Sequence, residues 1–163
     1  MGLDHSFDIV SRVDFQEVTN AVQTTLKEIR NRFDFKHSRA DILQDKEKLT
    51  LLAEDDFKLK NLRAALEEKL VRRKVPLKAL TFGRVEDAAG QMVRQEVVFQ
   101  AGIPSEKARE IVKLIKAGKF KAQVAIQGDE VRVSSAKIDV LQEVITFLKG
   151  RDLGIHMQFT NYR

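Results

Sequence analysis

The order of its short alternating and amphipathic segments constrains this chain more than any single motif. Residues 6–12 alternate apolar and polar side chains, as a half-buried strand does. A helix is predicted next, because Asp14 and Glu17 resemble a capping box and apolar residues recur at helical spacing from Phe15 to Phe33. Two short strands are predicted within 39–54, a second helix ends before Pro76, and a short strand follows at 77–82. The order is strand, helix, strand, strand, helix, strand.

The same order begins again after a polar connector at 83–91. A strand at 92–101 is followed by a helix that Pro104 and Ser105 open and Gly118 ends. A hairpin at 121–135 turns through Gly128 and Asp129, and a last helix and strand close the chain. We therefore predict an α+β protein of two tandem ferredoxin-like (βαββαβ) domains. Each has an antiparallel four-stranded sheet with two helices on one face and the other face open.

Composition narrows the class of protein. Of 163 residues, 43% are hydrophobic and 33% charged, which is ordinary for a folded soluble domain. No run reaches the roughly 18 apolar residues of a spanning helix, and nothing marks the N-terminus for export, so we expect a cytoplasmic protein without a membrane partner. The absence of cysteine removes disulfides, thiol nucleophiles and thiolate zinc sites. The net charge of +5 permits an anionic partner but is low for a dedicated binder of double-stranded nucleic acid.

Five stretches resemble the YajQ family of bacterial nucleotide-binding proteins: SFDIVS at 6–11, NRFDF at 31–35, IVKLIK at 111–116, VAIQGDEVRV at 124–133 and QFTNYR at 158–163. The resemblance implies two ferredoxin-like domains whose first strands are exchanged. One domain would be 14–103, completed by a strand at 91–101, and the other 1–13 with 104–163. It also implies binding of nucleotides or RNA, with cyclic di-GMP sensed by some members, and no established catalytic activity. The sequence of residues 76–91 does not match the usual family pattern, so the resemblance implies nothing about that segment.

The hairpin carries a polar face. If Val124 and Ile126 face the helices, then Gln123 and Gln127 point outward, with Glu130, Arg132 and Ser134 on the next strand. A forked Arg132 suits the two acceptors of a guanine edge, and Gln amides can read a base. The alternative is a solvated sheet face on which Arg132 pairs with a cross-strand carboxylate. No outward position of these strands or of residues 8 and 10 offers an aromatic ring for base stacking.

A basic stripe precedes the hairpin. Arg109, Lys113 and Lys116 share the side of their helix away from Ile111 and Ile115, and Lys119 and Lys121 follow. Such a stripe can contact phosphates as point charges without reading sequence. The alternative is a solvated helix face whose lysines suit the C-terminal end of the helix dipole.

Other candidates carry less chemistry. The three histidines lack metal-ligand spacing, Asp55 and Asp56 fit a helix N-terminus, and no phosphate-binding glycine motif occurs. Of Phe33 and Phe35, one is expected in the core, and Phe35 beside Lys36 is the candidate exposed ring.

We predict a non-enzymatic nucleotide-binding protein without metal or cofactor, possessing no catalytic residues. An RNA-binding protein using open sheet faces and the basic helix is the alternative.

Overall fold

The structure is a computed structural model that describes residues 5–163, and its chain forms two compact units. The N-terminal unit is 13–100, and the C-terminal unit combines 5–12 with 101–163. The predicted domain limits, 14–103 and 1–13 with 104–163, stay a prediction, and residues 1–4 lie outside the described part. No helix among residues 5–163 has both the length and the apolar character needed to cross a membrane.

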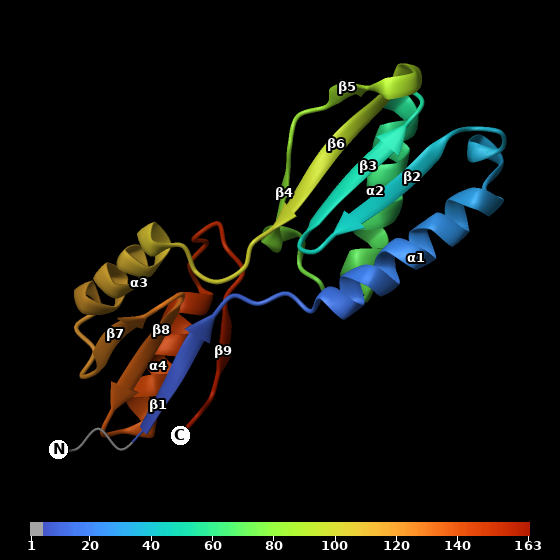
Figure 1. Ribbon diagram of the computed structural model, residues 1–163. Helices are drawn as coiled ribbons and strands as arrows, with labels where there is room; N and C mark the ends of the chain where they lie inside the picture. The colour runs from blue at the N-terminus through green and yellow to red at the C-terminus, as the bar shows by residue number, and fades with distance from the viewer. Residues whose placement is uncertain (1–4) are drawn as a thin grey trace. The chain divides into compact units, whose positions relative to one another are not determined.

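The C-terminal unit is built around the first strand of the chain (Figure 1). Its sheet has the order β7-β8-β1-β9, so β1 lies between β8 and β9 and pairs antiparallel with both. The two helices of the unit pack on one face of this sheet, where their apolar residues share a core with those of the strands. The elements are β1 (His5–Val10), α3 (Ser105–Ala117), β7 (Gln123–Gln127), β8 (Glu130–Ser135), α4 (Ile138–Lys149) and β9 (Gln158–Thr160).

The N-terminal unit repeats this plan with a strand from the middle of the chain. Its sheet has the order β2-β3-β6-β4, and all its pairs are antiparallel. The elements are α1 (Phe15–Asn31), β2 (Ala40–Asp45), β3 (Lys48–Ala53), α2 (Asp56–Arg72), β4 (Leu80–Phe82), β5 (Glu86–Ala88) and β6 (Met92–Phe99). Because β1 completes one sheet and β6 the other, the predicted α+β fold with exchanged strands is confirmed.

Each unit has its own core. Phe7, Ile9, Val131 and Val133 are fully buried in the C-terminal unit, as strict alternation on β1 and β8 requires. Leucines of α2 and β3 form the second core with residues of α1 and β6. The helix caps also follow the sequence: the side chain of Asp14 accepts from Gln16 N at the start of α1.

Two segments differ from expectation. The connector predicted at 83–91 contains β5, which pairs with Met92–Arg94. This happens because β4 covers only Val97–Phe99, so the rest of that edge of the eight-residue β6 is free to pair. The final strand, which the alternation in IHMQFTN predicts over 155–161, is only Gln158–Thr160. Asn161 interrupts it with a φ of 55°, a conformation that Asn tolerates better than most residues.

Candidate functional site

The polar face of the β7-β8 hairpin points as predicted. Gln123 lies opposite Ser134, and Gln127 opposite Glu130, on the face that α3 and α4 leave uncovered. Val131 and Val133 point to the core. Ile126 also points that way but is 46% exposed, because β7 is the edge strand of the sheet. The hairpin therefore carries a row of polar side chains at the edge of the sheet, where β7 is held by its pairing with β8.

Arg132 is not free on this face. It lies opposite Asp8 of β1, and its Nε donates to Asp8 Oδ1 at 2.9 Å while its Nη2 lies 3.5 Å from Oδ2. Asn161 Nδ2 donates to Asp8 Oδ2 at 2.9 Å. The hydrogen bond from Arg132 lowers the pKa of Asp8, with help from Asn161, against the burial that raises it. Pairing with a cross-strand carboxylate, the alternative left open by the sequence, is what the structure contains.

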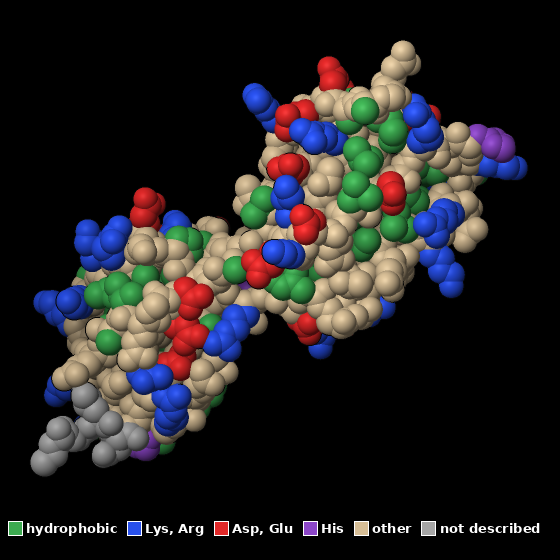
Figure 2. Space-filling view, in the orientation of Figure 1, with side chains coloured by type: hydrophobic (Ala, Val, Ile, Leu, Met, Phe, Trp, Pro, Cys, Tyr) green, Lys and Arg blue, Asp and Glu red, His purple; other side chains and the backbone are tan. Residues whose placement is uncertain are grey.

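The basic stripe forms a ridge with unpaired charges. We call Arg109, Lys113, Lys116, Lys119 and Lys121 the basic ridge. All five are exposed, and within residues 5–163 none of them forms an ion pair. Figure 2 shows Lys and Arg side chains gathered over α3, with acidic side chains toward one end. Lys107 on the same helix differs, because its Nζ lies 3.3 Å from Glu110 Oε2.

The ridge and the hairpin face do not form one pocket. Ile111 and Ile115 of α3 pack on the covered face of the sheet, so the ridge points away from that side, whereas Gln127 and Arg132 project from the opposite face. The two surfaces approach each other only where the chain passes from α3 into β7, at Lys119, Lys121 and Gln123. A small ligand that touches both must therefore bind at this edge of the sheet.

The open sheet faces lack the features of RNA-recognition surfaces. In the part of the chain that the structure describes, the outward positions of β7, β8, β1 and β9 include no aromatic residue, as predicted. The open face of the N-terminal sheet carries more acids than bases. The outward charged residues are Asp41, Asp45, Lys48, Glu86, Arg94 and Glu96. Both bases lie near acids, Lys48 Nζ at 3.5 Å from Glu96 and Arg94 Nη2 at 3.9 Å from Glu86.

One aromatic ring is strongly exposed near the end of α1. Phe35 is buried, with the Arg32 and Lys58 cations 5.4 and 5.2 Å from its ring centre. Phe33 is 90% exposed. One of the two phenylalanines enters the core, as expected, but the exposed ring is Phe33 rather than Phe35.

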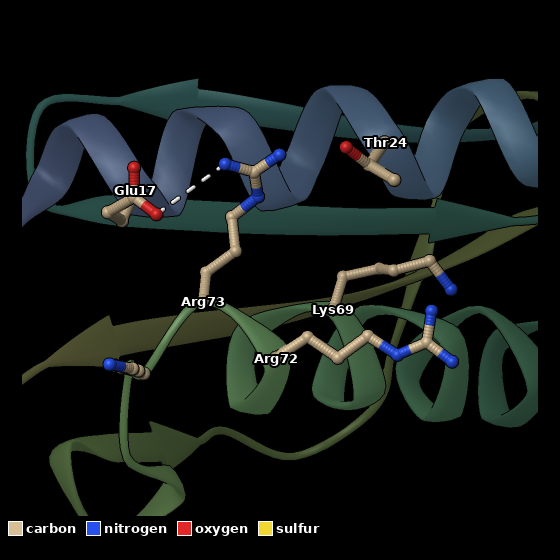
Figure 3. Close-up of a pocket in the computed structure, with 6 residues that line it drawn as sticks. Glu17, Thr24, Lys69, Arg72 and Arg73 are labelled. Carbon is tan, nitrogen blue, oxygen red and sulfur yellow. Dashed lines mark hydrogen bonds and ion pairs between the residues drawn. The ribbon is translucent and has the colours of Figure 1, made fainter.

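A groove between α1 and α2 was not predicted. Figure 3 shows its lining, which comes from both helices. Its volume is about 420 Å³, and it is lined by Glu17, Thr24, Lys69, Arg72, Arg73 and Lys74. We call it the α1–α2 groove. The sequence signal was the basic run within residues 69–74, which at a helix C-terminus is usually explained by the helix dipole alone.

Metal-ligating groups are not gathered anywhere in the described chain. Among residues 5–163, no set of three or more His, Asp or Glu side chains is placed to hold a metal ion. Asp55, considered above as one of two adjacent carboxylates, caps α2 by accepting from Lys58 N at 2.7 Å.

Known proteins resemble the chain over its whole length. The family described as "Nucleotide-binding protein YajQ-like" matches residues 5–163. A nucleotide-binding protein of Koribacter versatilis is 54% identical over 160 residues, 98% of each chain. Another, from Desulfitobacterium hafniense, is 54% identical over 163 residues, all of both chains. One from Geotalea uraniireducens is 52% identical, covering 97% of this chain and 98% of its own. A chain with exchanged strands, an unpaired basic ridge and relatives of this identity belongs to the YajQ-like family of nucleotide-binding proteins.

Proposed function

We propose that this protein binds nucleotides through their phosphate groups on the basic ridge, without catalysing a reaction on them. The observation that carries the proposal is the set of five exposed cations without acidic partners in the described chain. An unpaired cation keeps its full attraction for a phosphate, whereas one in an ion pair must first lose a partner. The names of the relatives, which are all nucleotide-binding proteins, support the same ligand class.

The edge where the ridge meets the hairpin is the proposed place for a base. Lys119 and Lys121 supply charge there, and the exposed amide of Gln123 supplies donors and acceptors for a base edge. Gln127, at the other end of β7, extends the same polar row toward the hairpin turn. Arg132 takes part through the donors that Asp8 leaves unused, because a guanidinium has five N–H groups. A guanine ligand with two phosphates, such as cyclic di-GMP, suits this combination of charges and amides.

The test changes two ridge cations together. Lys113→Gln/Lys116→Gln should lower the affinity for guanine nucleotides, adenine nucleotides and cyclic di-GMP by similar factors, and reduce the salt dependence. Lys107→Gln on the same helix is the matched control, because Lys107 already pairs with Glu110. A loss confined to one base would contradict phosphate recognition by the ridge. Conversion of bound nucleotide during the titration would contradict a non-enzymatic role.

Base reading is tested separately by Arg132→Lys. The lysine keeps the charge but lacks the planar guanidinium. The variant should therefore bind guanine and adenine nucleotides with similar affinity, while its affinity for phosphate groups remains. If the variant binds both nucleotides as the parent does, the hairpin face does not read bases.

RNA binding is the second candidate, and the exposed ring of Phe33 favours it. A ring that is 90% exposed can stack on an unpaired base, and the open face of the C-terminal sheet offers no such ring among the described residues. Binding of a short single-stranded RNA should then weaken steeply with salt and fall when Phe33 is changed to Ala. A small nucleotide held at the ridge edge should be indifferent to Phe33→Ala.

A further inference from the structure

We propose that the α1–α2 groove is a second anion site, which binds the diphosphate group of a small molecule. The groove belongs wholly to the N-terminal unit, so the proposal does not rest on the basic ridge. Its volume of about 420 Å³ is at the small end of the 300–1,000 Å³ typical of ligand sites, which suits a compact ligand.

Positive charge dominates the lining of the groove. Four of its six lining residues are Lys or Arg, and Glu17 is the single carboxylate among them. Glu28 and Glu68, which pair with Lys69 and Arg72, are not part of the lining. An anion in the groove therefore meets Lys69 and Arg72 at a lining that does not contain their acidic partners, whereas Glu17, the partner of Arg73, is part of that lining.

Lys69 is the buried cation of the groove. The residue is 5% exposed, its Nζ donates to Glu28 Oε1 at 2.8 Å, and Glu68 Oε1 lies 3.5 Å away. An ammonium group has three N–H donors, so one remains without a partner among residues 5–163. A buried charge is screened less by salt than an exposed one. Lys69 is thus the anchor for a phosphoryl oxygen.

The two arginines give the groove two ends. In Figure 3, Arg73 reaches from the end of α2 to Glu17 on α1, while the tips of Lys69 and Arg72 turn the other way, beneath Thr24. The Arg73 to Glu17 contact is long, at 3.5 Å, and Arg72 is largely exposed. Exposed ion pairs of this kind contribute little, so a ligand can compete for both guanidinium groups. Cations at two ends match a ligand with two linked phosphates.

Lys74 occupies a position where glycine is favoured. It follows the last turn of α2 with a φ of 63°, and Val75 N bonds to Leu70 O at 2.9 Å around it. A non-glycine residue is strained in this left-handed conformation, so lysine costs the turn stability that glycine would give it. Because its side chain lines the groove, anion binding gives a reason for a lysine there.

The experiment titrates inorganic pyrophosphate into the protein by calorimetry at low salt. All proteins carry Lys113→Gln/Lys116→Gln, which removes two of the five ridge cations. The groove variants leave the other three unchanged, so a change in binding between these proteins reports the groove and the two proposals fail separately. Arg72→Gln should weaken pyrophosphate binding about tenfold, the loss of one charge-assisted contact. Lys74→Gly should weaken it about two- to fivefold and yet raise the melting temperature by a few degrees, because the strain at residue 74 is relieved.

The opposite signs of the two effects of Lys74→Gly separate binding from folding. Lys60→Gln is the matched control, since Lys60 is exposed on the same helix and outside the groove, and it should change neither property. ADP and GDP that bind as pyrophosphate does would identify the diphosphate as the recognised group, and tighter binding of one would add its nucleoside. Absence of pyrophosphate binding, or binding unchanged by both groove variants, would overturn the proposal.

Discussion

At the scale of the single residue, Asp8 shows how an open sheet face can hold a buried charge. Asp8 points away from the helices but is 2% exposed, because Arg132 and Asn161 close over its carboxylate. A carboxylate buried in this way is stable only while its donors remain in place. Arg132 therefore stabilises the buried carboxylate of Asp8, and any base that it contacts meets a guanidinium whose orientation is fixed.

Asp8→Asn tests how much the pairing of Asp8 with Arg132 and Asn161 stabilises the fold. The amide brings donors toward those of Arg132 and Asn161, so we expect the C-terminal unit to lose about 1–3 kcal/mol. Because the folded pKa of Asp8 lies below its ordinary value of 3.8, the carboxylate stabilises the fold fully above that pH and less as pH falls through the lower folded pKa. Urea unfolding at several pH values should show the gap between parent and variant shrinking below about pH 4.

Glu143→Gln is the control for this prediction, since Glu143 is an exposed carboxylate on α4 of the same unit. It should change stability by less than about 0.5 kcal/mol. A gap between Asp8→Asn and the parent that stays constant down to pH 2 would mean that Asp8 is not the titrating group.

At the scale of the element, β1 is the strand on which the C-terminal unit depends. It lies between β8 and β9, and the ring of Phe7 is 5.9 Å from that of Phe159 and 6.2 Å from that of Tyr162. The partners of β1 follow it in the chain by more than a hundred residues, as His5 opposite Ser135 shows. The residue pattern of a short stretch of sequence cannot predict a pairing over such a separation.

Phe7→Ala should loosen the C-terminal unit alone. Truncating a fully buried phenylalanine costs about 3–5 kcal/mol, so amides within 101–163 should exchange faster while those within 13–100 keep their protection. Phe33→Ala is the same chemical change at an exposed position and should cost less than about 0.5 kcal/mol. Faster exchange confined to 13–100 would contradict the placement of β1.

Element order and strand facing could be predicted from the sequence, whereas contacts between distant elements could not. The alternation in residues 130–135 places Val131 and Val133 inward whatever the partners of the strand are. The groove exists only because α1 lies beside α2, which brings Glu17 within 3.5 Å of Arg73. Nothing in the run at 69–74 specifies that neighbour.

At the scale of the whole molecule, the two cores give the chain two separate sources of stability. No residue belongs to both clusters of buried side chains among residues 5–163. The sequence also provides a convenient probe, because it has one tyrosine, Tyr162, and no tryptophan. Tyrosine fluorescence therefore reports the C-terminal unit, while far-ultraviolet circular dichroism reports both units.

Leu62→Ala should separate these two signals. Leu62 is fully buried in the core of the N-terminal unit, and its truncation costs about 2–5 kcal/mol. In urea, part of the dichroism change should move to lower denaturant while the Tyr162 transition stays in place. A Tyr162 transition that moves by the same amount would show that the two units unfold together.

The exchange of β1 also sets the order in which the protein can be completed during synthesis. The N-terminal unit has all its strands once residue 99 has left the ribosome, but β1 must wait for β8 and β9. Since β8, the first partner to be made, is complete about 125 residues after β1, a ribosome adding about 5–20 residues per second leaves the strand unpaired for roughly 6–25 s. Throughout that interval Phe7 and Ile9 are apolar surface without a sheet, which a chaperone could cover.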